Sequence, residues 1–136
     1  PGFAGKRFES NIGAVDANGH PTNCCGILCS GDATYKGVAP GLDSIASSMV
    51  NGSAVMMTNM NWMITQTNER PENVNYSITD GTVNASDYIN IDQFFDGVTD
   101  TFNVMVSKSA GNNGFGTGSP TITRPAPAYN LMACAS

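Results

Sequence analysis

Apolar residues in this chain alternate between helical spacing and short continuous runs, and that alternation constrains the fold more than any other feature. Helices are expected at 21–30, 55–64 and 88–102, and strands at 43–50, 74–78, 104–106 and 130–135. Strands that alternate with helices of ten or more residues are typical of an α/β fold with a mainly parallel sheet. Ligand sites in such sheets lie at the carboxyl ends of the strands.

The three expected helices differ in character. Segment 21–30 is nearly all small or apolar, with Pro21 suited to a first helical position, so it predicts a short buried helix. Methionines recur through 55–64, and core packing explains them better than a metal or cofactor box. Segment 88–102 repeats large apolar residues every three or four positions, as an amphipathic helix does.

Charge and hydropathy exclude two classes of partner. The formal net charge is -5 and the six basic residues are scattered, whereas a nucleic-acid binder needs clustered cations to neutralise phosphates. No run of about 18 apolar residues occurs, so no membrane span is predicted.

The cysteines are Cys24, Cys25, Cys29 and Cys134. Three of them fall within six residues, which suits no common disulfide framework, so buried reduced thiols are expected. A small zinc or thiol redox protein is an alternative, because His20 and Cys24 share a helix face. No second CxxC or HxxxH pair supports a metal, and we expect neither a metal nor another cofactor.

Three segments, in this order, carry a resemblance to a known family. GHPTNCCGI (19–27) resembles the GHGTHVAGI of the subtilases, the subtilisin-like serine proteases. YKGVAPG (35–41) is similar to their YxGVAPxA, and SAGNNG (109–114) to their (S/A)AGN(N/E)G. The resemblance runs from about residue 18 to 136, and the separation of the first and last motifs is close to that in secreted subtilisins.

The resemblance implies two catalytic roles. His20 would be the general base that takes the proton of an attacking serine, and it is the only histidine in the chain. Asn112 would be the side-chain donor that stabilises the oxyanion of the tetrahedral intermediate. The alternatives to these catalytic roles are structural: His20 would be a polar residue at a helix start, and Asn112 would be an ordinary turn residue.

Three other segments also resemble the family. VNYSI (74–78) resembles one wall of its substrate cleft, and MVNGSA (49–54) resembles the glycine-rich edge that pairs with the substrate backbone. TRPAPAYNLMACAS (123–136) resembles the stretch that follows the oxyanion asparagine. The substrate-binding residues implied are Gly52, Ser53, Ser77, Ile78, Thr79, Ala110 and Gly111. Thr79 stands where the family usually has a pocket glycine, Pro21 replaces the glycine after the histidine, and Lys108 lies in a normally apolar strand.

The resemblance also implies a three-layer α/β fold, a mainly parallel sheet flanked by helices, that is incomplete in this chain. No segment matches the family's aspartate strand or its GTS nucleophile, so residues 1–136 form part of a catalytic domain. We therefore expect exposed apolar surface, or other chains or segments of the same protease domain as partners.

The predicted function is a segment of a secreted or cell-surface serine endopeptidase that acts on peptide or protein substrates. Whether the complete assembly is an active enzyme is left open. The alternative is a catalytically inactive subtilase-fold binding or structural module, which Pro21, Thr79 and Lys108 favour.

Overall fold

The computed structural model describes residues 2–11, 19–48, 53–76, 80–83, 88–112 and 122–135. The chain divides into an N-terminal unit, Pro1–Met49, and a C-terminal unit, Val50–Ser136. Each unit has its own strands and helices, and each is described by itself.

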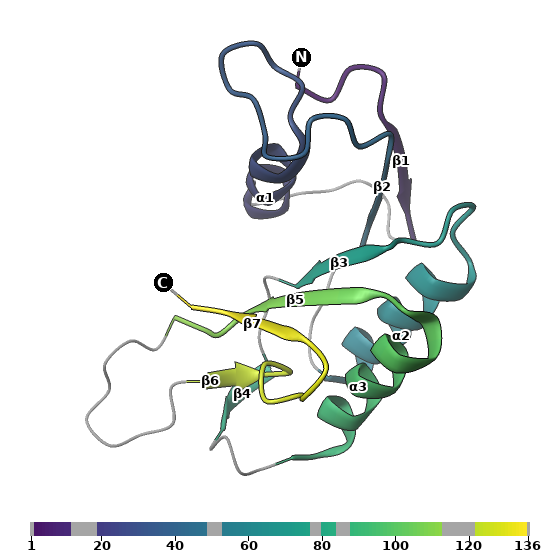
Figure 1. Ribbon diagram of the computed structural model, residues 1–136, viewed down its shortest axis with the longest axis vertical. Coiled ribbons are helices and arrows are strands. Elements are labelled where there is room, and N and C mark those ends of the chain that lie inside the picture. Colours follow the sequence, from purple (N-terminus) through teal and green to yellow (C-terminus); the bar gives the residue numbers. More distant parts are fainter. Residues whose placement is uncertain are drawn as a thin grey trace. The chain divides into compact units, whose positions relative to one another are not determined.

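The N-terminal unit contains strand β1 (Arg7–Ser10), helix α1 (His20–Cys29) and strand β2 (Ser44–Ser47) (Figure 1). The two strands pair in parallel, with Arg7 opposite Ser44. The Lys6 ammonium supports this pairing by donating to the carbonyls of Pro40, at 2.8 Å, and Leu42, at 2.5 Å. No apolar pattern predicts β1, since Phe8 is its one large apolar residue and is half exposed.

The YKGVAPG segment packs on the end of α1. Val38 and Ala39 donate backbone hydrogen bonds to helix carbonyls, and Gly37 donates to Ser30 at 2.8 Å. A Cβ on Gly37 would lie 2.5 Å from the Ser30 nitrogen and 2.7 Å from the Cys29 nitrogen. Only glycine permits so close an approach of two backbones.

Helix α1 is not the buried helix that its composition predicts. Cys29 is its one buried side chain, whereas Ile27 is 70% exposed and Leu28 is 38% exposed. The prediction of a buried helix is therefore wrong for α1, whose large apolar side chains are exposed among the described residues.

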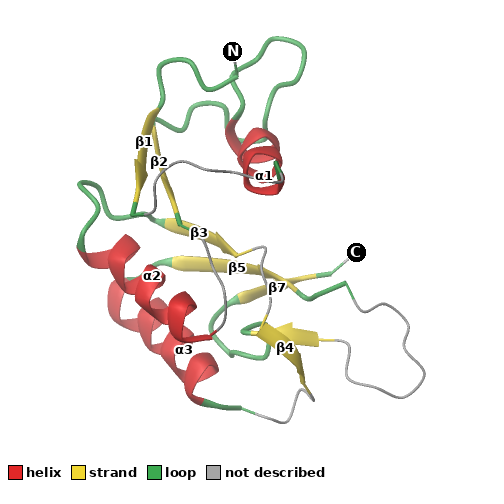
Figure 2. Cartoon of the chain, turned by 180° about the vertical axis from the view of Figure 1, so that it is seen from behind, coloured by secondary structure: helices red, strands yellow, loops and turns green. Residues whose placement is uncertain are grey.

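The C-terminal unit holds the remaining elements, which are α2 (Ser53–Thr65), β3 (Asn73–Tyr76), β4 (Asp80–Val83), α3 (Asn90–Phe102), β5 (Met105–Ser109), β6 (Ile122–Arg124) and β7 (Met132–Cys134). Strands β3, β5 and β7 form a parallel sheet in that order, with α2 and α3 together on one face (Figures 1 and 2). Strands β4 and β6 form a small antiparallel pair. Parallel sheets with helices are compatible with the predicted α/β fold, although the described residues do not establish its three layers.

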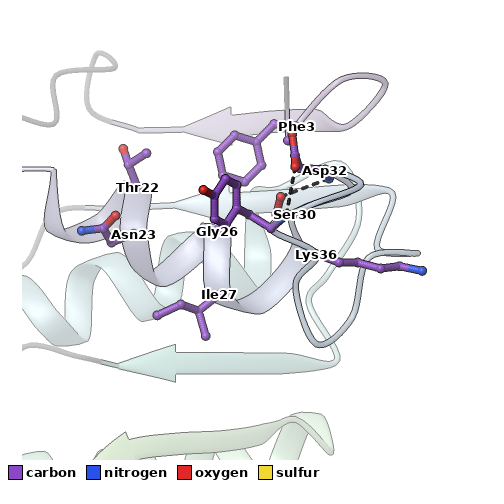
Figure 3. A pocket seen from close by; sticks show the side chains of 10 residues that line it. Phe3, Thr22, Asn23, Gly26, Ile27, Ser30, Asp32 and Lys36 are labelled. Atoms are coloured by element: carbon purple, nitrogen blue, oxygen red, sulfur yellow. Dashed lines mark hydrogen bonds between the residues drawn. The ribbon is translucent and has the colours of Figure 1, made fainter.

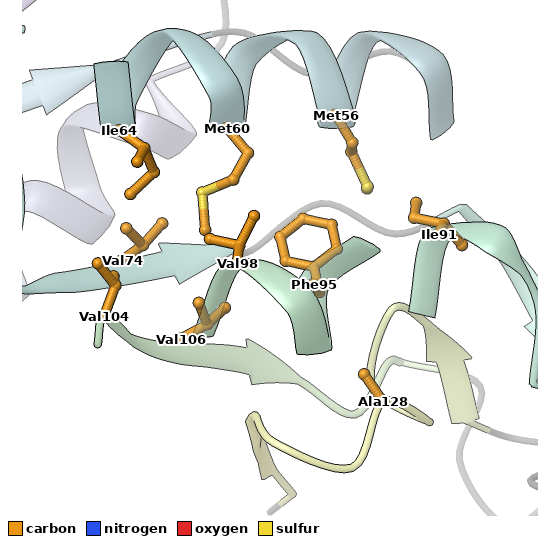
Figure 4. Packing of buried hydrophobic residues seen from close by; sticks show 10 residues of the cluster. All are labelled: Met56, Met60, Ile64, Val74, Ile91, Phe95, Val98, Val104, Val106 and Ala128. Carbon is orange, nitrogen blue, oxygen red and sulfur yellow. The ribbon is translucent and has the colours of Figure 1, made fainter. Parts of the chain in front are cut away.

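The core of this unit lies between the two helices and the sheet (Figure 4). Its buried members are Met56, Met60, Ile64, Val74, Ile91, Phe95, Val98, Val104, Val106 and Ala128. Met57 and Met63 pack against this cluster, so the interpretation of the methionines as core is confirmed.

Two aspartates lie on the buried side of α3, one turn apart. Asp92 pairs with Arg124 of β6 and also accepts the Ile89 N–H, at 3.0 Å, at the start of the helix. Asp96 accepts the backbone N–H groups of Tyr129 and Asn130 in the loop that leads to β7. These carboxylates fix β6 and the approach to β7 against the helix.

Candidate functional site

The polar segment that follows β5 leaves the sheet at the carboxyl end of a central strand. Ala110 and Gly111 are partly buried and Asn112 is exposed. Gly111 has φ 120°, in a region that L side chains rarely adopt, so the turn toward Asn112 requires glycine. The segment therefore lies at the end of the sheet where ligand sites of parallel sheets commonly occur.

Neighbouring strands form hydrogen bonds with both the backbone N–H and the backbone carbonyl of Ala110, the first residue of this segment. The Ala110 N–H donates to the Cys134 carbonyl at 2.7 Å. The Ala110 carbonyl accepts two bonds from Thr123 of β6, from the N–H at 2.8 Å and from the hydroxyl at 3.2 Å. Thr123 is itself buried, so these bonds face little competition from water.

Lys108 precedes this segment and is 1% exposed. Its ammonium donates to the Ser109 carbonyl at 2.5 Å and to the Ser109 hydroxyl at 2.9 Å. Burial lowers the pKa of Lys108 to about 8, because the interior disfavours the charged form. No carboxylate among the described residues pairs with it.

His20 is the first residue of α1 and is exposed. Gly19 caps the helix in the left-handed conformation at φ 76°, and its carbonyl accepts the Asn23 N–H at 2.9 Å. The His20 Nε2 lies 3.6 Å from the Cys24 Sγ, one turn along the helix. An exposed imidazole at a helix start is able to exchange protons with a bound molecule.

The predicted site residues are only partly described. Ala110, Gly111 and Asn112 are contiguous, and Ser53 is the first residue of α2. Gly52, Ser77, Ile78 and Thr79 lie outside the described residues. His20 belongs to the N-terminal unit and Asn112 to the C-terminal unit, so their proximity stays a prediction.

An open hollow of about 540 Å³ lies on one side of α1 (Figure 3). Thr22, Gly26 and Ile27 line it from the helix, with Phe3 and Asp32 among the residues opposite. The Asp32 carboxylate accepts the N–H groups of Thr34 and Tyr35, and these bonds lower its pKa. None of the predicted site residues that the structure describes lines this hollow.

The cysteines are all free thiols, but the expectation that they are buried holds in full only for Cys29. Burial raises the pKa of the Cys29 thiol. Cys24 and Cys25 are partly buried, whereas Cys134 is exposed, which corrects the prediction for that residue. In the part of the chain that the structure describes, no group of three His, Cys, Asp or Glu residues is arranged to hold a metal ion.

Sequence reasoning missed the residues that support the Asn112 segment. Thr123 and Arg124 are polar yet buried, so no apolar alternation marks β6 as a strand. The one sequence signal for Lys108 is its charge in a strand that is normally apolar in the resembled family. That signal does not indicate that its ammonium bonds Ser109.

Comparison with known families adds one finding. The sequence model of the subtilase family matches residues 7–136. Among curated proteins, none matches the chain. Within the described residues, no helix is long and apolar enough to cross a membrane.

Proposed function

Because the chain belongs to the subtilase family, we propose that it forms part of the catalytic domain of a serine endopeptidase that cleaves peptide bonds. In this proposal His20 is the general base and Asn112 is the oxyanion donor. The triad aspartate and the nucleophilic serine come from residues outside this sequence. The proposed setting is secreted or at the cell surface, in line with many members of the family.

The family match carries the proposal, and the geometry of each unit supports it. His20 begins a helix and is exposed, and its ring Nε2 lies 3.6 Å from the Cys24 Sγ. Asn112 follows a central strand, and its backbone is set by a left-handed Gly111 and by the two-sided anchoring of Ala110. An oxyanion donor must be fixed before the reaction, because a donor that reorganises during it contributes little.

The substrate cleft belongs to the proposal as well. Ala110 and Gly111 would form one wall, with Ser77, Ile78 and Thr79 opposite and Gly52 and Ser53 at the edge. Peptide or protein substrates would pair with these backbones.

The test is labelling by a serine-directed phosphonyl fluoride. A serine oxygen displaces fluoride from phosphorus while a base takes the serine proton. The folded protease domain should be labelled, at a serine outside residues 1–136. Replacing His20 with Ala should abolish labelling, because the hydroxyl then has no base, whereas Asn23→Ala on the exposed side of α1 should label normally.

One observation favours a second function, an inactive subtilase-fold module that binds or supports other segments. In the first turn of α1, Pro21 takes the place of the glycine that follows the histidine in the family motif. A folded wild-type domain that takes up no label would support this module and would contradict the endopeptidase. A label on a serine within 1–136 would show that the nucleophile assignment is wrong.

A further inference from the structure

Two successive carbonyls before Asn112 are tied down by buried side chains from two strands. The Ser109 carbonyl accepts the Lys108 ammonium at 2.5 Å, and the Ala110 carbonyl accepts the Thr123 hydroxyl at 3.2 Å. Lys108 is 1% exposed and Thr123 is 3% exposed. Chain segments that leave a sheet usually gain mobility, so two buried side-chain bonds at this point are a specific restraint.

We propose that Lys108 and Thr123 form a clamp, and that they are positioning residues for the Asn112 side chain in the oxyanion step. The inference rests on the proposed function, because it assigns roles within that same site. Neither residue touches substrate. Each acts by restricting the backbone from Ser109 to Asn112, which turns at the left-handed Gly111.

Burying the Lys108 ammonium is, by itself, unfavourable for folding. The Lys108 ammonium is removed from water and meets no carboxylate in the described part of the chain, so it loses hydration that two bonds to Ser109 replace only in part. A methionine at this position would fill similar space without that loss. A residue that weakens the fold while restraining a donor segment is what a functional constraint produces.

The Thr123 half depends on where β6 lies. Its neighbour Arg124 forms a buried ion pair with Asp92 of α3, Nη1 to Oδ2 2.5 Å. That ion pair joins β6 to α3, a helix of the core. It therefore fixes the strand from which the Thr123 hydroxyl donates to the Ala110 carbonyl. The clamp is therefore continuous with the packed interior of the C-terminal unit.

The experiment compares Lys108→Met, Thr123→Val and Thr123→Ser with wild type in the folded protease domain. Thr99→Val is the matched control, because it removes a hydroxyl bond to a carbonyl, at 2.9 Å, inside α3. Peptide hydrolysis gives kcat and KM, and amide hydrogen exchange reports the mobility of residues 110–112.

Lys108→Met and Thr123→Val should lower kcat roughly ten- to a hundredfold with little change in KM, because only the transition state uses the positioned donor. Both should speed amide exchange at 110–112. Thr123→Ser keeps the hydroxyl and should retain wild-type values, and Thr99→Val should change neither measurement.

Two results would overturn the clamp. Unchanged exchange at 110–112 in both variants would show that the segment is held by other contacts. Faster exchange with unchanged kcat would show that the restraint has no part in catalysis. A wild type without hydrolysis or labelling refutes the endopeptidase instead, and hydrogen exchange then decides by itself whether the clamp exists.

Discussion

The Arg124 guanidinium and the Asp92 carboxylate form a buried ion pair that joins β6 to the first turn of α3. Asp92 is fully buried, and its Oδ1 has no hydrogen-bond partner among the described residues. The Asp92 charge therefore depends on Arg124, because removing the guanidinium leaves a buried carboxylate without its ion-pair partner. The pair fixes the position of β6, from which Thr123 reaches the segment before Asn112.

Arg124→Met should lower the free energy of unfolding by about 3–5 kcal/mol, because it leaves the Asp92 charge buried without its cation. The double variant Arg124→Met with Asp92→Asn should lose less than Arg124→Met by itself. Asp100→Asn changes an exposed carboxylate in the same helix and should stay within about 0.5 kcal/mol of wild type. Urea unfolding measures the stability of all three variants. A double variant that is less stable than Arg124→Met alone would contradict the pairing argument.

Gly37→Ala should destabilise the N-terminal unit by about 1–3 kcal/mol, the usual cost of inserting a methyl group into a packed site. The new Cβ would meet backbone atoms of Cys29 and Ser30, and backbone cannot rotate away as a side chain can. Gly41→Ala, four residues later, meets no atom within 4 Å and is the matched control. Thermal unfolding should separate the two variants, and equal melting temperatures would show that the two backbones are not in close contact.

Local sequence pattern predicted α2 and α3 because their apolar residues repeat with helical spacing. Phe95 and Val98 of α3 and Met56 and Met60 of α2 are buried, as that spacing requires. Strand β6 escaped prediction since its buried residues are polar. Their partners, Ala110 and Asp92, lie far away in sequence, and no local pattern records such a pairing.

The candidate site, like the fold, contains some residues that the sequence predicts and others that it does not. Family motifs predict roles for His20 and Asn112, and those roles stay predictions. Thr123 begins a segment that resembles the family, but the resemblance gives no sign of its two hydrogen bonds to the Ala110 carbonyl. Composition also could not predict that α1 is exposed, since small and apolar residues indicate only that a helix could be buried.

Lys108→Met should make the protein more stable at pH 7, with a gain that disappears as the pH rises. Burial lowers the Lys108 pKa from 10.5 to about 8, so between these values the unfolded chain binds a proton that the folded chain does not. Wild-type stability should therefore rise through this window relative to the variant. Melting temperatures from pH 7 to 10.5 test this, with the exposed Lys36→Met as control. A constant difference between Lys108→Met and wild type would contradict the buried amine.

Asn112→Ala should lower kcat steeply and leave KM nearly unchanged. The side chain would donate to an oxygen that becomes negative only in the transition state, so substrate binding gains little from it. The expected loss is about 10²–10³-fold, a magnitude that belongs to the oxyanion asparagine of subtilisin, a member of this family, and is carried over from it.

The control for Asn112→Ala is Asn61→Ala, which removes an exposed amide from α2 in the same unit and should leave both kinetic constants at wild-type values. Asn112→Asp keeps the size of the side chain but has no N–H to donate, so it should lose at least as much kcat as Asn112→Ala. Because the carboxylate would also repel a developing oxyanion, Asn112→Asp separates donation from mere filling of space. An Asn112→Asp enzyme with wild-type kcat would remove Asn112 from the mechanism.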